Sequence, residues 1–268
     1  MATQKSDTTT TIPVINGVVV VFLFDFLPQH RIWAWMKLMQ GTRGLFKTFP
    51  GLRFAKVMGS GEGGGFGLRP SSTHQGLIMV FDDLIHAYQS LKSGEIMRYQ
   101  EKTHEYWQGV LLVDSCRGSW DHQSWNSQNL LQEAVQDPVQ SGSAHDGSSA
   151  YIASLTRASI RASQAMNFWR FAPPAQVDLK KASGCELAVG LGEAPLVRQC
   201  TFSVWQDAQS LTNYAHQGAH MRAIGAAQKH NFFTESMFVR MKVLHMWGQW
   251  MGKTFDTDFN EITPLALN

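Results

Sequence analysis

The chain repeats itself, because segments of its first half recur in the same order in its second half. The matched segments are residues 59–62 with 190–193, 77–83 with 201–207 and 118–120 with 248–250. The offset is 124 residues for the second pair (201 minus 77) and 130 residues for the third (248 minus 118). An internal duplication of this kind predicts two copies of one structural unit within the chain.

Each half shows the same predicted order of elements: strand, helix, strand, strand, helix, strand. In the first half we expect strands at 18–26, 53–57, 76–82 and 109–114, with helices at 32–39 and at 84–107, the latter broken at Gly94. In the second half we expect strands at 151–160, 186–190, 200–205 and 237–243, with helices at 165–171, before Pro173-Pro174, and at 208–227.

This order is that of the ferredoxin-like unit. Two such units can each cover the apolar sheet face that the other would expose. We therefore expect an α+β fold of two tandem ferredoxin-like (βαββαβ) repeats, packed sheet to sheet as an intrachain dimeric α/β barrel. The expected boundaries are 12–120 for the first repeat, 121–149 for a linker, 150–255 for the second repeat and 256–268 for a C-terminal tail.

Composition excludes several classes of protein. With 268 residues, 44% hydrophobic and 16% charged, the chain can bury a full core. The formal charge of +2 and the lack of a block of like charges argue against nucleic acid as a partner. The three cysteines are an odd number without a CxxC motif, which favours a reducing, cytoplasmic compartment over a disulfide framework or a structural zinc site.

The sequence carries neither a signal peptide nor a membrane span in its pattern. Residues 1–11 are polar and threonine-rich, without the basic-then-apolar order of a secretory signal. The longest apolar run, Val18–Phe24, is broken by Asp25 and is far shorter than the ~20 residues that cross a bilayer. We expect a soluble protein that a lipid-borne substrate would bring to the inner membrane as a peripheral contact.

The two halves differ at a histidine. At an offset of 124 residues His220 corresponds to Ile96, and Gly218 corresponds to Gly94, which supports the alignment. His216 lies four residues earlier, hence on the same face of a helix. A lone histidine is more often a solvated or capping residue, but this one occurs in one copy only. The facing strands supply polar groups, namely Arg157, Gln199, Thr201 and Ser203.

A resemblance to a known family rests on ten segments spread over roughly residues 18–255. They are Phe24–Phe26, Arg31–Trp33, Met58–Phe66, Gly118–Asp121, Leu155–Ile160, Phe168-Trp169, Gly190–Pro195, Gln199–Trp205, His220–Ile224 and Thr234–Arg240. In these segments the chain resembles the spheroidene monooxygenase family, which introduces keto groups into acyclic carotenoids. Phe232-Phe233 departs from a family pattern with tryptophan before phenylalanine, and His230 is a further local difference. Both differences concern a pocket wall.

The resemblance also implies a cofactor. The family is similar to haem proteins of the dimeric α/β barrel type, among them aldoxime dehydratases, in which a helical histidine binds iron. Residues 214–224 resemble that haem-ligand helix, with a histidine four residues before an isoleucine. The resemblance therefore implies haem b bound in the second half, with His220 as the iron ligand and His216 as the second candidate.

The residues themselves leave more than one cofactor open. Oxidation of an unactivated carbon requires a cofactor, since no side chain supplies that chemistry. The glycine-rich stretch 59–67 precedes a strand and opens no helix, so it is no dinucleotide fingerprint. An iron site of His216, His220 and Glu193 is an alternative. An apolar slot of Trp, Phe and Met suits a porphyrin, although the same composition is typical of an ordinary core.

Site roles follow from the expected placement. We expect Arg157, Gln199 and Ser203 to act in catalysis by polarising an iron-bound oxygen or orienting substrate, with an ion pair or a haem propionate as the alternative role of Arg157. Arg240, Trp169 and Phe202 are the expected further contacts of the cofactor, and Glu193, which has a counterpart in Glu62, is expected to be structural.

The leading functional hypothesis is a haem-dependent carotenoid monooxygenase that uses O₂ and electrons from an external reductase, an electron-donor protein. The alternatives are a haem enzyme of another reaction class, dehydratase or peroxidase-like, acting on a small substrate, and a non-catalytic haem-binding module. A duplicated chain can close its own barrel and still pair as a homodimer.

Overall fold

The computed structural model describes residues 12–65, 67, 69–128, 130, 151–194, 196–216, 221, 225–227 and 229–257. Most of the expected linker at 121–149 and of the expected tail at 256–268 lies outside these residues, so the domain boundaries stay a prediction. In the first half the elements are β1 (Val14–Asn16), β2 (Val18–Phe26), α1 (Arg31–Gln40), α2 (Leu45–Thr48), β3 (Leu52–Gly61), β4 (Pro70–Phe81), α3 (Leu84–Leu91), α4 (Gly94–Gln100), β5 (Thr103–Gly118) and β6 (Ser124–Asn126).

The second half follows with a similar series. Its elements are β7 (Ile152–Ile160), α6 (Ala165–Lys181), β8 (Cys185–Ala194), β9 (Arg198–Trp205), α7 (Ala208–Ala215), β10 (Phe233–Trp250) and β11 (Lys253–Asp256). Short 3₁₀ turns cover Pro28–His30 (η1), Glu62–Gly64 (η2) and Ala162–Gln164 (η3). The β1 and β6 strands form a separate parallel pair.

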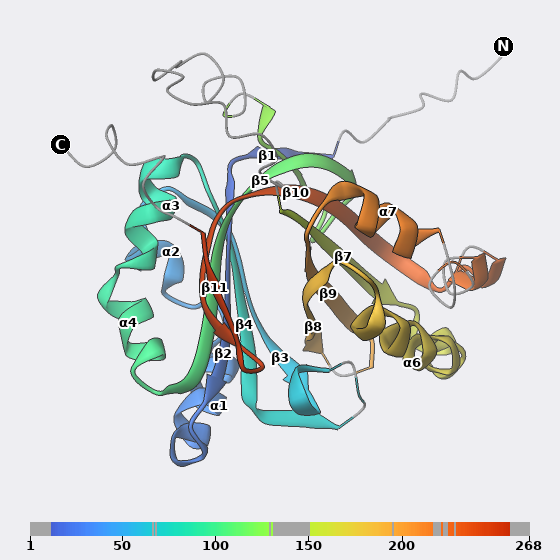
Figure 1. The fold of residues 1–268 in the computed structure, drawn as a ribbon, viewed down its shortest axis with the longest axis horizontal. Coiled ribbons are helices and arrows are strands. Elements are labelled where there is room, and N and C mark those ends of the chain that lie inside the picture. Colours follow the sequence, from blue (N-terminus) through green and yellow to red (C-terminus); the bar gives the residue numbers. More distant parts are fainter. Residues whose placement is uncertain are drawn as a thin grey trace, which may run out of the picture.

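Eight strands form a closed antiparallel barrel, so the fold is mixed α+β. The strand order is β10-β5-β2-β4-β3-β8-β9-β7, and β7 pairs again with β10. The β11 strand extends the sheet beyond β10. Helices α1 to α4 lie outside the first half of the barrel, and α6 and α7 lie outside the second (Figure 1).

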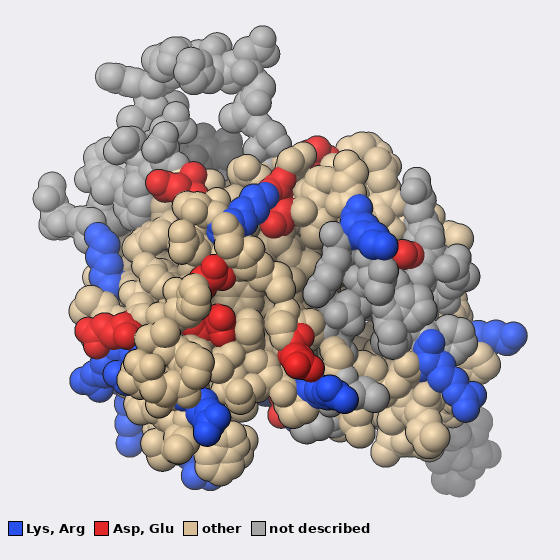
Figure 2. Space-filling view, turned by 60° about the horizontal axis from the view of Figure 1, so that its bottom comes forward, with Lys and Arg blue, Asp and Glu red and all other residues tan. Residues whose placement is uncertain are grey.

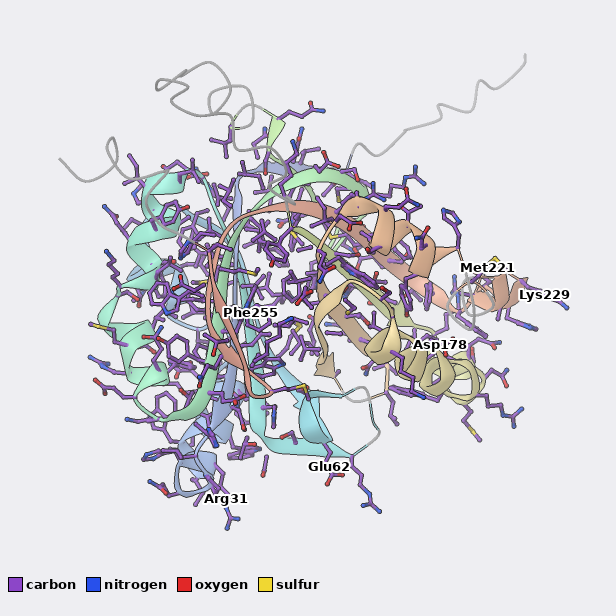
Figure 3. The ribbon with its side chains drawn as sticks, in the orientation of Figure 1. Arg31, Glu62, Asp178, Met221, Lys229 and Phe255 are labelled. Atoms are coloured by element: carbon purple, nitrogen blue, oxygen red, sulfur yellow. The ribbon has the colours of Figure 1, made fainter. Side chains whose placement is uncertain are left out.

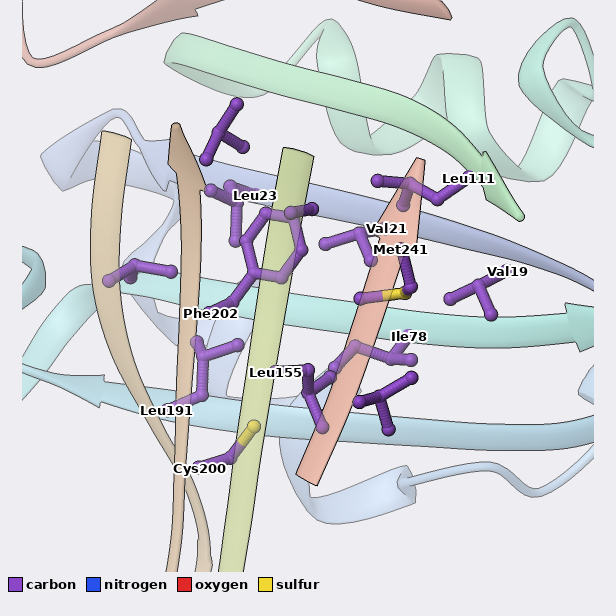
Figure 4. Packing of buried hydrophobic residues seen from close by; sticks show 14 of the residues in the cluster. Val19, Val21, Leu23, Ile78, Leu111, Leu155, Leu191, Cys200, Phe202 and Met241 are labelled. Carbon is purple, nitrogen blue, oxygen red and sulfur yellow. The ribbon is translucent and has the colours of Figure 1, made fainter. Parts of the chain in front are cut away.

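The barrel interior is a packed apolar core. Side chains alternate along each strand, so every second residue points inward. Val19, Val21 and Leu23 of β2 meet Leu155 of β7 and Phe202 of β9 in this interior (Figure 4). A barrel of this size is filled by its own side chains, which directs the search for a binding site to the outer faces.

Equivalent residues of the two halves make equivalent contacts. Asp83 caps α3 and Asp207 caps α7, each accepting a hydrogen bond from a backbone N–H three residues later. A second pair lies 130 residues apart: Glu105 accepts from the N–H of Gly252, and Glu235 accepts from the N–H of His122. The sequence repeat is therefore also a repeat of contacts.

Two of the junctions between the halves differ greatly in extent. Strands β5 and β10 pair along most of their length, from Gly118 opposite Met237 to Trp107 opposite Gly248. Among the described residues, β3 and β8 pair only through Gly59 with Gly192 and Ser60 with Leu191. The Ser60 hydroxyl adds a hydrogen bond of 2.6 Å to the carbonyl of Gly190. The barrel closes least firmly between β3 and β8.

Several elements differ from those expected. The expected helix at 84–107 ends at Gln100, because the alternating residues from Thr103 onward extend β5 instead. Helix α6 continues through Pro173-Pro174, whose fixed φ is compatible with a helix although their nitrogens donate no hydrogen bond. The expected helix at 208–227 is described as α7 up to Ala215, and much of its remainder lies outside the described residues.

No helix in the described part of the chain combines the length and apolarity needed to cross a membrane.

Replacement of a repeated glycine tests the junction between β5 and β10. Gly118 and Gly248 have φ of +83° and +113°, and a Cβ on either would clash with a carbonyl oxygen of the neighbouring strand. We expect Gly118→Ala to lower the free energy of unfolding by about 3 kcal/mol, measured by urea denaturation. The matched control is Gly94→Ala, where a Cβ meets open space. An equal unfolding midpoint for both variants would contradict the assigned strain.

Candidate functional site on the outer face of the second half

The halves differ most on the faces of the barrel that are turned toward the helices. Val18 pairs with Phe81 as Ile152 pairs with Trp205, so the two halves can be matched strand by strand. On these faces Val20, Phe22, Leu77, Met79 and Val57 of the first half correspond to Ser154, Thr156, Thr201, Ser203 and Gly190 of the second. We call this second set the hydroxyl face.

In the first half this face is a core. Val20, Phe22 and Met79 are completely buried and pack in one cluster with residues of α1 to α4. In the second half Ser154, Thr156 and Thr201 stay half-buried. The space that large apolar side chains fill in one copy is thus left unfilled by the strands of the other. A sheet face of small residues beneath helices is suited to holding a ligand.

Several side chains of the hydroxyl face have donor or acceptor groups that no described residue uses. Ser203 is buried, and its Oγ accepts a hydrogen bond of 2.9 Å from Nε1 of Trp205. Among the described residues no acceptor takes the Ser203 proton, and Thr156 and Thr201 form no side-chain hydrogen bond. Gln199 lies two residues before Thr201 on the same face and is half-buried. Polar groups left open in this way are available to a ligand.

Helices α6 and α7 pack over one edge of this face. Leu179 of α6 and Leu211 of α7 are buried with Ile152 and Trp205. The described residues between α7 and β10, such as Met221, lie on the same side of the barrel as α6 (Figure 3). The two helices therefore cover one edge of the hydroxyl face.

Of the two candidate histidines only His216 is described. It is the C-cap of α7, and its side chain is exposed. His220 lies outside the described residues.

Two other expected cofactor contacts lie near this region. Arg240 of β10 is half-buried and stands opposite Ser154, so its side chain shares the outer face. Trp169 of α6 donates a hydrogen bond of 3.0 Å from its indole nitrogen to the carbonyl of Leu196. That bond fixes the start of α6 against the turn between β8 and β9.

Arg157 and Phe202 lie on the opposite side of the sheet, inside the barrel. Arg157 pairs with Cys200, in the same inward-facing row as Leu155, and Phe202 contacts Trp107 within the core. This corrects the expectation that Arg157 and Phe202 share a face with Ser203. The physical reason is the two-residue period of a strand, which separates neighbours such as Phe202 and Ser203.

Arg157 is the centre of a buried charge cluster at one end of the barrel. It is 1% exposed and bonds to Glu235 of β10 and, at 3.3 Å, to Glu193 of β8. Lys56 of β3 approaches the second oxygen of Glu193 to 3.0 Å and also pairs with Asp121. The indole of Trp120 donates to Glu193 and lies under the guanidinium of Arg157. The cluster joins β3 to β8 where their backbone pairing is short.

Each carboxylate in this cluster has a cationic partner. Burial alone would raise the pKa of Glu235, but hydrogen bonds from the His122 N–H, the Ser119 hydroxyl and Arg157 together hold its pKa below the ordinary value. The carboxylate is therefore ionised at neutral pH. Glu193 is bonded to Arg157 and Lys56 inside the barrel, whereas the alternative iron site with His216 and His220 would need this carboxylate on the outer side. In the described part of the chain no group of three or more His, Cys, Asp or Glu side chains could hold a metal.

Sequence reasoning missed Ser154, Thr156 and Gly190 in the outer site. A position-by-position comparison of the halves, which selected His220, would have found them. The sequence analysis expected Glu193 to be structural because Glu62 matches it in the repeat. In the structure, however, Glu62 is exposed and lies outside the charge cluster. The sequence pattern did not predict that Glu235 and Lys56 belong to the charge cluster, because their partners come from distant strands.

Comparison with known proteins gives a consistent result. No protein-family model matches the chain. The spheroidene monooxygenase of Rubrivivax gelatinosus is 43% identical over 241 residues, covering 90% of this chain and 87% of that protein. That of Cereibacter sphaeroides is 28% identical over 228 residues, covering 84% and 66%. The crystal structure of an aldoxime dehydratase shares the fold, with a TM-score of 0.51, 12% identity and coverage of 85% and 82%.

The fold and the sequence relatives define an α+β barrel protein of the monooxygenase class, and hence an oxidoreductase. The 43% identity to the Rubrivivax protein, over most of both chains, is high enough to assign the chain to one family within this class. The chain belongs to the spheroidene monooxygenase family.

Removal of the central arginine tests the charge cluster. Arg157→Met leaves the partly buried Glu193 and Glu235 without their shared partner, and the loss of a partner in a buried ion pair typically costs about 3–5 kcal/mol. We expect thermal unfolding to show a destabilisation of that size. Arg198→Met is the control, because Arg198 is half exposed and 3.8 Å from Glu193, so its loss should cost less than about 1 kcal/mol. Equal effects of the two substitutions would show that the cluster does not stabilise the barrel.

Proposed function

We propose that the chain is a haem-dependent monooxygenase that introduces hydroxy and keto groups into acyclic carotenoids of the spheroidene type. The observation that carries this proposal is the hydroxyl face, where the second copy of the repeat lacks the apolar filling of the first. The names of the relatives support the substrate class. We further interpret the halves as tandem ferredoxin-like repeats, with the first as the structural half and the second as the haem-binding half.

The residues on this face are compatible with a flat cofactor. Gly190, Ser154 and Thr201 give a low surface where Val57, Val20 and Leu77 would stand in the other copy. We propose His220 as the iron ligand of haem b, with His216 as the second candidate. Arg240 shares the outer face and would pair with a propionate. When bound, haem would supply the oxygen activation that side chains do not provide.

Each hydroxylation balances with two external electrons, so formation of a ketone takes four. One hydroxylation consumes O₂, two electrons and two protons, converts C–H into C–OH and releases water. A second hydroxylation at the same carbon gives a geminal diol, which loses water to become a ketone. In this scheme Ser203 donates a proton toward the reacting oxygen, because its Oγ already accepts from Trp205. Gln199 and Thr201 orient the substrate by hydrogen bonding.

The reaction also defines partners. The electrons require an electron-donor protein, an external reductase, and O₂ is the second substrate. A long polyene dissolves in lipid, so we place the protein in the cytoplasm with a peripheral contact to the inner membrane. Homodimer formation is compatible with an internally closed barrel.

The iron ligand can be identified by absorption spectroscopy. We expect His220→Ala to abolish the Soret band of protein reconstituted with haem, because the band of the bound cofactor depends on its axial ligand. His216→Ala is the matched control and should retain the band. The opposite result would assign the iron to His216, and a band unchanged in both variants would exclude the whole segment.

Two substitutions of one residue separate space from chemistry. Ser203→Met restores the residue of the first copy and should eliminate haem binding by filling the face. Ser203→Ala keeps the space and removes only the hydroxyl, so the Soret band should remain while turnover falls about 100-fold, a typical loss for a proton donor. Turnover is measured by mass analysis of pigments in a host that makes acyclic carotenoids. Full turnover by Ser203→Met would contradict the proposed site, and haem binding without any carotenoid product would favour another haem-protein function.

A further inference from the structure

Helix α1 presents two contrasting faces. Ala34 is completely buried, and Trp33 packs edge-on against Phe26 and Tyr99. The outward side carries large apolar side chains instead. Ile32, Trp35, Met36 and Met39 are 67%, 60%, 53% and 58% exposed. Their spacing of three and four residues places them on one continuous stripe of the helix.

The next helix along the chain carries a further exposed apolar side chain, and exposed basic residues lie close to both helices in the sequence. Phe46 of α2 is 52% exposed. Arg31, Arg43 and Lys47 are exposed, and none of them forms an ion pair with the described residues. From residue 26 to residue 61 the sequence contains no Asp or Glu, but it contains Arg31, Lys37, Arg43, Lys47, Arg53 and Lys56. We call the five apolar and three bordering basic side chains the α1 patch.

The α1 patch is held rigidly in place. Lys37 binds Glu95 of α4 at 2.7 Å, and the aromatic contacts of Trp33 fix the buried side of the helix. The apolar side chains of α1 therefore stay on the surface, each more than half exposed. In Figure 3 Arg31 points outward at the lower end of the molecule, and Figure 2 shows several Lys and Arg side chains along the lower left edge, with Asp or Glu side chains above them.

We propose that the α1 patch docks the protein onto an anionic phospholipid bilayer. A helix with exposed Trp and Met on one stripe and basic residues beside it lies in the plane of a membrane interface. Exposed Lys and Arg are attracted by the negative surface of such a bilayer. The proposal deepens the proposed function and rests on it for its purpose, since a bilayer is where an acyclic carotenoid would be collected.

The charge and position of the patch favour lipid over a protein partner. A second copy of the chain would bring two basic borders face to face, with no acidic residue in the patch to balance them. An electron donor must approach the cofactor, but α1 lies outside the first half of the barrel, whereas the hydroxyl face is on the second (Figure 1). An anionic bilayer matches both the positive charge and the apolar stripe.

Vesicle co-sedimentation with the full chain tests this docking. We expect binding to phosphatidylcholine vesicles that contain phosphatidylglycerol, weakening as salt rises, and much weaker binding to phosphatidylcholine alone. Trp35→Ser combined with Met39→Ser should weaken binding about 100-fold, because two apolar side chains no longer insert. Arg31→Gln, Arg43→Gln and Lys47→Gln should each weaken it about fivefold. Ile85→Ser combined with Met97→Ser, which removes similarly exposed side chains of α3 and α4, should leave it unchanged.

Three results would overturn the proposal. They are absence of binding by the unaltered chain, equal binding by the Trp35/Met39 variant, and a change of oligomeric state in that variant by light scattering, which would make the patch a protein interface. Circular dichroism verifies that each variant folds, and the charge variants test the patch independently of the apolar ones.

Turnover of a carotenoid dissolved in detergent separates the docking hypothesis from the proposed function. Patch variants should retain this turnover and lose only turnover of vesicle-borne substrate. Vesicle binding without turnover of either substrate would refute the proposed function and leave the docking intact.

Discussion

Closure of the barrel depends on the charge cluster around Arg157. Between β3 and β8 the backbone contributes two residue pairs, far fewer than between β5 and β10. Glu193 compensates by receiving Lys56 from β3 and Arg157 from β7, while Arg157 also reaches Glu235 on β10. Burying these charges is tolerable only because each has a partner. Ionic contacts therefore close the barrel at the end where the charge cluster lies. The outer faces of the two halves take no part in this closure, so their side chains can differ.

The outer faces of the two halves differ in how much apolar surface they bury. The first half packs Val20, Phe22 and Met79 completely under four helices and supplies a large share of the apolar burial. The second replaces these side chains with Ser154, Thr156 and Ser203. Open polar surface beneath helices is costly in a fold that must stand alone. Here the neighbouring copy supplies the stability that such a surface lacks.

Much of the fold could be predicted from sequence, because its signals are local. Strand 18–26 and the helix near 32–39 follow from apolar periodicity, and the repeat matched Asp83 with Asp207, which the structure shows to be equivalent helix caps. The end of α4 was missed because Thr103 onward is compatible with both helical and alternating patterns. The side on which Arg157 points was missed for a different reason. A polar residue in an apolar strand suggests an outward position, and only its distant partners Glu193 and Glu235 allow it to face inward.

The near-twofold relation between the halves passes through Gly59 and Gly192, which pair with each other and occupy equivalent positions, since Gly59 stands opposite Gln75 as Gly192 stands opposite Gln199. In an assembly of two identical chains, any substitution appears on both sides of such an axis. In a single chain that contains both halves, a residue of one half can be substituted without any change at the equivalent residue of the other half. The stoichiometry follows: a barrel of this kind carries one hydroxyl face per molecule, where a symmetric pair would carry two.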